Sequence, residues 1–131
     1  MIEQVADSDK IIAIIIRNSY SNEGITFFTP QDFSQQMAYM RHPACHRIAP
    51  HVHKRVDREV QFTQEVLFIK KGKVKVDFYT HEKKYLKSTI LETGDVILLA
   101  SGGHGFTMLE ETEMIEVKQG PYAGDEDKEK F

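Results

Sequence analysis

The sequence predicts an all-β fold with one short helix near its N-terminus, and the pattern of apolar residues supports that prediction. From about Cys45 onward, short apolar or alternating segments recur at even spacing and are separated by turn residues, which is typical of a β-sandwich or β-barrel. The clearest segment is 73–79, where Val74, Val76 and Phe78 alternate with polar residues, as in a strand with one buried face. With 131 residues, the chain has the length of one domain with a core of moderate size.

Strands are expected wherever a short apolar run lies between turn residues. The run from Ile11 to Ile16 is rich in β-branched residues and far shorter than the roughly 20 residues that span a bilayer, so we predict a buried strand there. The other strands are expected at residues 25–29, 65–70, 73–79, 85–91, 96–99, 106–109 and 114–118.

The single helix is expected between residues 30 and 42. Thr29 is a suitable N-cap, Pro30 suits the first helical position, and Pro43 would end the helix. The three- to four-residue spacing of Phe33, Met37 and Met40 also suits a helix. We expect one domain over 1–131, with its core at about 45–120, an N-terminal extension at 1–44 and a frayed charged tail at 124–131.

The net charge, the cysteine count and the first residues of the sequence predict which partners and which cell compartment to expect. The net charge is −3 and the basic residues are scattered, so nothing favours nucleic acid or an anionic membrane as a partner. Cys45 is the one cysteine in the sequence, so no intrachain disulfide can form. The first residues are acidic where a signal peptide would be basic, so we expect a cytoplasmic protein.

A pair of histidines is the first feature that suggests chemistry. In His51-Val52-His53 the two imidazoles are two residues apart, so on a strand they would project from the same face. Two converging imidazoles suit a transition metal. A pair of surface histidines is the alternative that this motif leaves open.

Glu65 and His104 are the second and third features. Glu65 is the first residue of an apolar strand. The two-residue period of a strand would place its side chain on the core face, where a carboxylate destabilises the fold unless it is paired. If the strand began one residue later, Glu65 would be a solvated side chain. His104 follows the turn Ser101-Gly102-Gly103 and would share a strand face with Phe106. An anion-binding loop at 101–105 is a poor alternative, because no helix is expected after it.

The order of these residues resembles the two sequence motifs of the cupin superfamily. His51-x-His53, followed by Glu65 and then Gly72 after six residues, resembles the first motif, and Gly94-Asp95, an apolar run, Gly102 and His104 resemble the second. The resemblance covers about residues 49–117, and it is nearest to small single-domain bacterial cupins that often occur among sugar or surface-polysaccharide genes. It implies a jelly-roll β-barrel that binds one divalent transition metal, Fe, Mn, Ni, Co or Zn, through His51, His53, Glu65 and His104.

The sequence departs from the cupin motifs at two places. Eleven residues separate His53 from Glu65, where the family has three or four, and a hairpin or bulge at 54–64 would absorb the difference. Glu59 is the rival carboxylate, but only Glu65 has the six-residue interval to a turn glycine. In the second motif Ala100 replaces the usual proline, and the interval before the histidine is one residue shorter.

The resemblance implies a protein that acts on a small oxygen-bearing molecule, sugar-like or a carboxylate. Isomerase or epimerase chemistry, dioxygenase chemistry and non-catalytic ligand binding all remain open. A metal-free isomerase with a histidine base and a tyrosine acid is a further alternative. A homodimer is expected, with residues 11–16 as a candidate edge strand. Tyr122 either folds over the barrel mouth or packs outside it.

Overall fold

The computed structural model describes residues 1–124 and 126–131 and shows a protein built almost entirely of antiparallel strands. The chain divides into two compact units, one formed by residues 1–20 and 62–131 and the other by residues 21–61. Each unit is described by itself below. The prediction of an all-β fold is confirmed.

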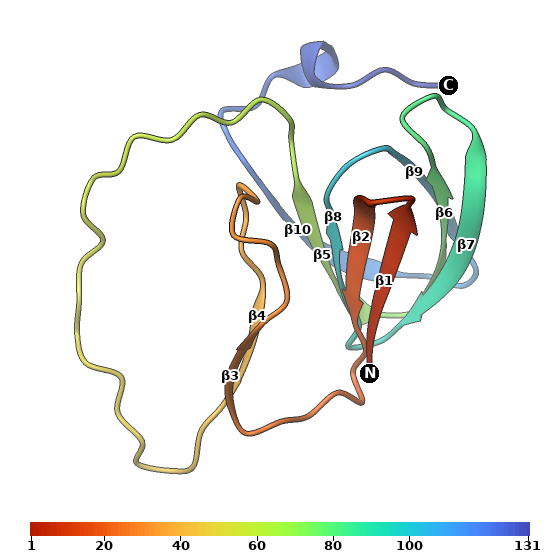
Figure 1. Cartoon of the computed structure of the whole chain (residues 1–131). Coiled ribbons are helices and arrows are strands. Elements are labelled where there is room, and N and C mark those ends of the chain that lie inside the picture. The colour runs from red at the N-terminus through yellow and green to blue at the C-terminus, as the bar shows by residue number, and fades with distance from the viewer. The chain divides into compact units, whose positions relative to one another are not determined.

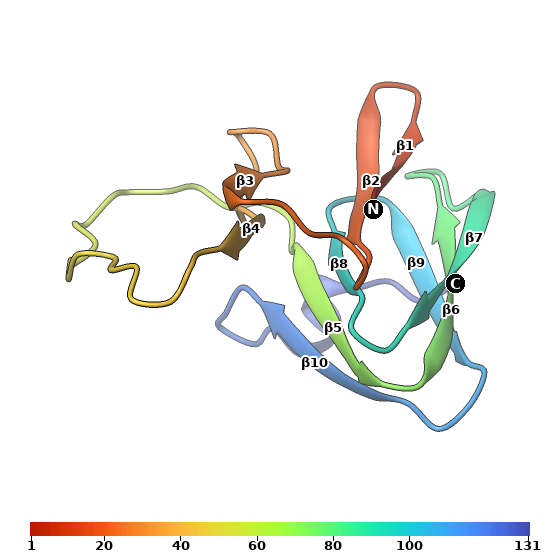
Figure 2. The same cartoon turned by 90° about the horizontal axis from the view of Figure 1, so that it is seen from below.

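The larger unit contains two antiparallel sheets (Figures 1 and 2). The five-stranded sheet has the order β1 (Ile2–Asp7), β2 (Lys10–Ile16), β8 (Val96–Leu99), β5 (Glu65–Lys71) and β10 (Glu113–Lys118). The three-stranded sheet has the order β7 (Tyr85–Glu92), β6 (Lys73–Tyr79) and β9 (Gly103–Met108). The strands expected from apolar patterning therefore form, with ends that move by a few residues.

The hydrophobic core lies between these two sheets. Apolar side chains from both sheets form one buried cluster, and many of them have no exposed surface: examples are Ile15, Ile69, Ile97, Val76 and Phe78. No strand pairing among the described residues joins the outer strands of one sheet to those of the other, so the two sheets form a sandwich. The closed barrel implied by the family resemblance is not formed, because β9 and β10 each pair along one edge only.

The N-terminal residues belong to the core sheet and are not a separate extension of it. β1 pairs with β2 through a tight turn at Ser8, whose φ of 55° is left-handed. β2 lies between β1 and β8, and its residues Ile12 to Ile16 are buried. The expected edge strand at 11–16 is therefore an interior strand of the chain's own sheet.

Arg17, just after β2, ties this hairpin to the rest of the sandwich. Its guanidinium donates to Glu3 (2.5 Å), to the carboxylate of Asp95 (2.9 Å) and to the carbonyl oxygen of Ile90 (2.6 Å). Asp95 is 4% exposed and also accepts the backbone N–H of Asn18. A buried carboxylate needs this degree of pairing, so the cluster is a structural one.

The smaller unit contains a hairpin of β3 (Gly24–Phe27) and β4 (Ala38–Arg41). The helix predicted at 30–42 was wrong: turns occupy residues 31–35, and a strand follows. The Thr29 hydroxyl accepts the backbone N–H of Met37, and the Gln36 amide donates to the carbonyls of Pro30 and Phe33. Side chains thus form hydrogen bonds with backbone N–H and C=O groups that a helix would pair with each other. The backbone groups of residues 38–41 pair instead with the neighbouring strand β3. No regular secondary structure forms at 42–61.

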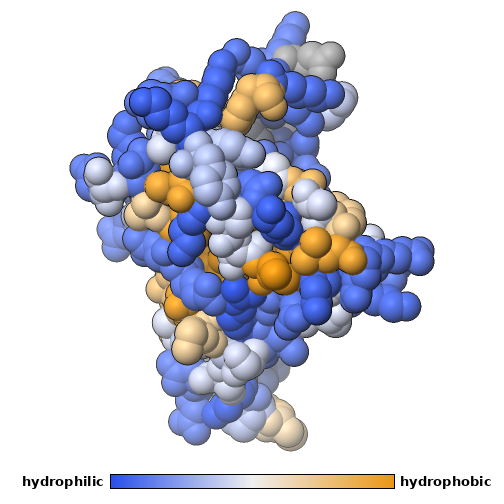
Figure 3. All heavy atoms as spheres, turned by 90° about the vertical axis from the view of Figure 1, so that its right-hand side faces the viewer, coloured by the Kyte–Doolittle hydropathy of each residue, from blue (hydrophilic) through white to orange (hydrophobic). Residues whose placement is uncertain are grey.

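The outer face of the three-stranded sheet is polar, as the alternation at 73–79 predicted. Lys73 pairs with Glu92 at 3.5 Å, and Lys75 pairs with Asp77 at 3.5 Å. Seen from the β7 side, the molecule is mostly hydrophilic with smaller hydrophobic patches (Figure 3). Among the described residues, no helix has the length and apolar character needed to cross a membrane.

Candidate metal centre

Glu65 is held on the inner face of the five-stranded sheet by the alternation of β5. It is the first residue of that strand, and Leu67 and Ile69, which share its face, are 3% and 0% exposed. The Glu65 side chain is itself only 18% exposed. The prediction that period two turns this carboxylate toward the core is confirmed.

His104 comes from the opposite sheet. It is the second residue of β9, pairs across the sheet with Phe78, and has a side chain that is 29% exposed. The turn before it requires glycine at 102, where φ is +69° and a Cβ would lie 2.6 Å from the carbonyl oxygen of Tyr79. A compact glycine turn therefore sets the start of β9, and with it the inward position of His104.

The structure brings Glu65 and His104 together between the two sheets. Glu65 Oε2 lies 3.5 Å from His104 Nε2. That separation exceeds the 2.7–3.2 Å of a good N–H···O hydrogen bond. Contact with the His104 side chain lowers the pKa of Glu65, against the effect of burial, and Lys118 contributes to the same lowering. The carboxylate is thus held in its charged form.

Lys118 completes the polar surroundings of this pair, and the sequence analysis missed it. It is the last residue of β10 and lies directly across from Glu65 in the sheet register, with Nζ 3.9 Å from Glu65 Oε1. Its ammonium also lies 3.1 Å from Glu116 and 5.9 Å from the centre of the Tyr122 ring. The Glu116 carboxylate raises the pKa of Lys118. Only the register of β10 against β5 reveals this residue.

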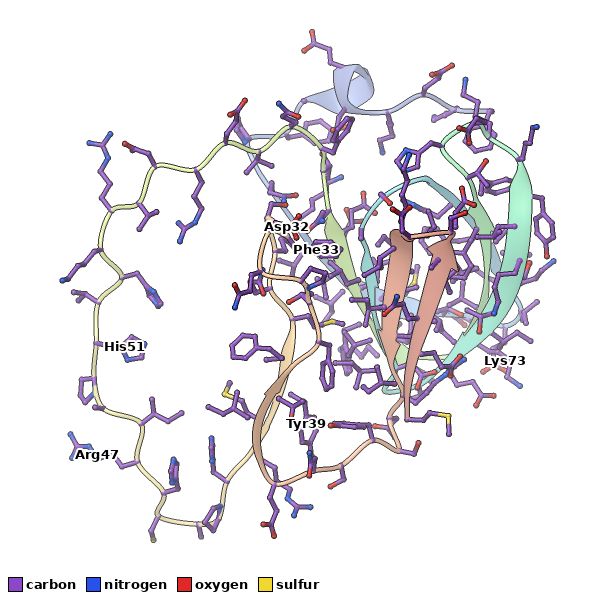
Figure 4. The ribbon with its side chains drawn as sticks, in the orientation of Figure 1. Asp32, Phe33, Tyr39, Arg47, His51 and Lys73 are labelled. Carbon is purple, nitrogen blue, oxygen red and sulfur yellow. The ribbon has the colours of Figure 1, made fainter. Side chains whose placement is uncertain are left out.

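His51 and His53 lie in the smaller unit, on the long segment without regular secondary structure (Figure 4). Both are exposed, their ring centroids are 5.3 Å apart, and the rings meet edge to face. His51 Nδ1 lies 2.8 Å from the carbonyl oxygen of Ala49. The expected strand at 51–53 does not form, and the positions of the two units relative to one another are not determined.

Within the smaller unit, the remaining candidate ligands do not form a metal-binding group with His51 and His53. Glu59, the rival carboxylate, is exposed on the same segment as His51 and accepts a hydrogen bond from Gln61. Cys45 is exposed. His42 and His46 stack on each other with centroids 4.1 Å apart. Within residues 1–124 and 126–131, no three His, Cys, Asp or Glu side chains are grouped closely enough to hold a metal ion.

A polar hollow lies at the other end of the sandwich, between the end of β2 and the start of β6. Arg17, Lys73, Glu92 and Asp95 are among the residues that line it. The Arg17 guanidinium donates hydrogen bonds to Glu3, Asp95, Ile90 and Thr89. Lys73 forms an ion pair with Glu92. The cations of this hollow are therefore already neutralised, and the Glu65–His104 end is the better candidate site.

No protein-family model matches the chain, and no curated protein or solved structure is significantly similar to it.

Proposed function

We propose that this protein binds one divalent transition metal ion through His51, His53, Glu65 and His104, and that the ion holds a small oxygen-bearing molecule. The contact between Glu65 and His104 is the observation that carries the proposal. These residues are far apart in sequence and come from facing sheets, yet their side chains converge at one end of the sandwich.

The distance between the two side chains suits two ligands of one ion. Metal–nitrogen and metal–oxygen bonds of about 2.0–2.2 Å place neighbouring ligand atoms about 2.8–3.1 Å apart at octahedral angles and about 3.3–3.6 Å apart at tetrahedral angles. Glu65 Oε2 and His104 Nε2 are 3.5 Å apart, which is long for a direct hydrogen bond. The lowered pKa of Glu65 keeps an anionic oxygen there, as a metal ligand must be.

His51 and His53 would supply the other two ligands. The carbonyl of Ala49 can only accept a hydrogen bond, so the contact at His51 assigns the proton to Nδ1 and leaves Nε2 free to bind a metal. A backbone acceptor on the second nitrogen is the usual arrangement for a metal-bound histidine. If residues 51–53 formed a strand, period two would turn both imidazoles to one side.

Three imidazoles and one carboxylate would leave one or two coordination positions open, where the ion would polarise a substrate oxygen or a water. The chain's own groups would then position the ligand: Glu65 would neutralise part of the ion's charge, and Phe106 would form an apolar wall beside His104, since their rings are 5.5 Å apart. Isomerase or epimerase chemistry, dioxygenase chemistry and non-catalytic ligand binding are all compatible with this arrangement.

Elemental analysis of protein purified without an affinity tag tests the proposal. We expect about one equivalent of a transition metal in the parent and almost none in Glu65→Gln, His104→Ala or the His51→Ala/His53→Ala double variant. His81→Ala is the matched control, because His81 is an exposed histidine in the β6–β7 hairpin, and it should retain the metal. Equal metal content in all of these proteins would refute the site.

A metal-free base is a second candidate, since the same contact would let the Glu65 carboxylate orient the His104 imidazole for proton transfer. This candidate predicts no bound metal in the parent and does not require His51 or His53. The double variant at 51 and 53 therefore distinguishes the two candidates: it should lose ligand binding only if the metal site is correct.

A further inference from the structure

The segment after β10 returns across the end of the sandwich that holds Glu65 and His104. We call the described residues 119–124 and 126–131 the strap. Its first anchor is Gln119, whose side-chain oxygen accepts the backbone N–H of Gln64 at 2.8 Å. Its second is Asp127, which accepts a hydrogen bond from the Thr63 hydroxyl at 2.5 Å. Both anchors lie on residues directly before Glu65.

Two more anchors fasten the strap to the opposite sheet. Glu129 forms an ion pair with Lys83 in the β6–β7 hairpin. The Phe131 ring packs edge to face on Tyr79, with centroids 5.0 Å apart and an interplanar angle of 86°. A Cβ on Gly103 would lie only 2.8 Å from the Phe131 ring, so that ring covers the backbone next to His104. Figure 1 shows this segment passing from β10 over the end of both sheets.

The anchors are of a kind that opens easily. The Lys83 and Glu129 side chains are 46% and 74% exposed, and Phe131 is 63% exposed. Exposed ion pairs and half-exposed aromatic contacts contribute little stability each. Segments held by few buried contacts open locally without global unfolding. The core strands beneath the strap contain residues such as Phe78 with no exposed surface, so they would stay in place when the strap opens.

We infer that the strap is a lid that gates access of a small ligand to the Glu65–His104 end of the sandwich. The inference rests on the proposed function only for the identity of the site that is covered. In the closed position the strap shields His104 at Gly103 and covers Glu65 at Thr63 and Gln64. Release of the Phe131 and Glu129 anchors would uncover His104, and release of Asp127 from Thr63 would uncover Glu65, while Gln119 holds the other end.

The rate at which diethyl pyrocarbonate modifies His104, followed by peptide mass spectrometry, tests the lid without any metal. His81 is exposed and serves as the internal reference. Loss of two anchors in Lys83→Ala/Phe131→Ala should raise the ratio of the His104 rate to the His81 rate at least about three-fold, because each anchor shifts the opening equilibrium by a few-fold. Lys84→Ala, a neighbouring lysine in the same hairpin, should leave the ratio unchanged.

Gly103→Ala provides an independent variant, since its Cβ would push the Phe131 ring away while all the anchoring side chains remain. It should raise the same ratio. An unchanged ratio in both the double variant and Gly103→Ala, with an unchanged far-UV circular dichroism spectrum as evidence of folding, would overturn the lid. Because no metal enters this assay, its failure is separate from a failure of the metal analysis.

Discussion

Replacing Glu65 by methionine should make the metal-free protein more stable. Under the proposed function, Glu65 is kept on the core face for metal binding at the expense of stability. The Glu65 side chain is 18% exposed, and complete burial of a methionine side chain contributes about 1.5–3 kcal/mol. The lost contacts with His104 at 3.5 Å and Lys118 at 3.9 Å each stabilise by less than about 1 kcal/mol. We therefore expect a net gain of about 0.5–1.5 kcal/mol in the free energy of unfolding.

Urea unfolding of chelator-treated protein at neutral pH measures this gain. With a slope of about 1–3 kcal/mol/M, the midpoint of Glu65→Met should rise by a few tenths of a molar unit. Glu116→Met is the matched control: it lies on the same face, its side chain is 44% exposed, and its midpoint should barely change. A loss of more than about 1 kcal/mol in Glu65→Met would mean that the carboxylate is a structural partner, and the reasoning would be refuted.

Three further predictions concern the fold. Arg17→Ala should lower the free energy of unfolding by about 2–3 kcal/mol, because it leaves the buried Asp95 carboxylate without its cation. Arg41 has a half-exposed side chain, so Arg41→Ala should lower the free energy of unfolding by less than about 1 kcal/mol. Equal losses in urea unfolding would contradict this prediction. The hydrogen bond from Arg17 lowers the pKa of Glu3 from its usual 4.5, so the stability due to its ionisation is present above pH 4.5 and is lost as the pH falls below it. Glu3→Gln should therefore lose less stability than the parent between pH 6 and pH 3, and an identical loss would count against the pairing. Phe78→Ala should cost about 3–5 kcal/mol, because the side chain is wholly buried between the sheets; a change below about 1 kcal/mol in thermal or urea unfolding would contradict that packing.

Apolar patterning predicted the strands well, because one side of each sheet is buried and period two is then visible in the sequence. The segment at 73–79 was predicted with the bounds that β6 has. β1 was missed, since Ile2–Asp7 contains two acidic residues and only one fully buried residue, Val5. Its strand forms because β2 offers it a partner across the turn at Ser8, which is a tertiary cause that local propensity does not contain.

The helix at 30–42 was predicted from an N-cap residue, a proline at the first helical position and an apolar spacing. These three features are compatible with a helix, but they are equally compatible with a turn followed by a strand. Gln36 decided the outcome by donating to the carbonyls of Pro30 and Phe33, and no propensity scale expresses such side-chain pairing. The site shows the same division. The strand faces of Glu65 and His104 were predicted correctly, because both residues lie on strands and period two then fixes the face. His51-x-His53 lies in a segment without regular secondary structure, so period two gives no face for these two imidazoles.

Anomalous diffraction at the metal's absorption edge, from crystals of untagged and metal-loaded protein, tests the central proposal most directly. We predict one peak within about 2.0–2.3 Å of Glu65 and His104, with the imidazoles of His51 and His53 at the same distance. A metal-loaded crystal in which Glu65 and His104 touch each other with no peak between them, or in which His51 and His53 lie remote from the ion, would contradict the proposed centre.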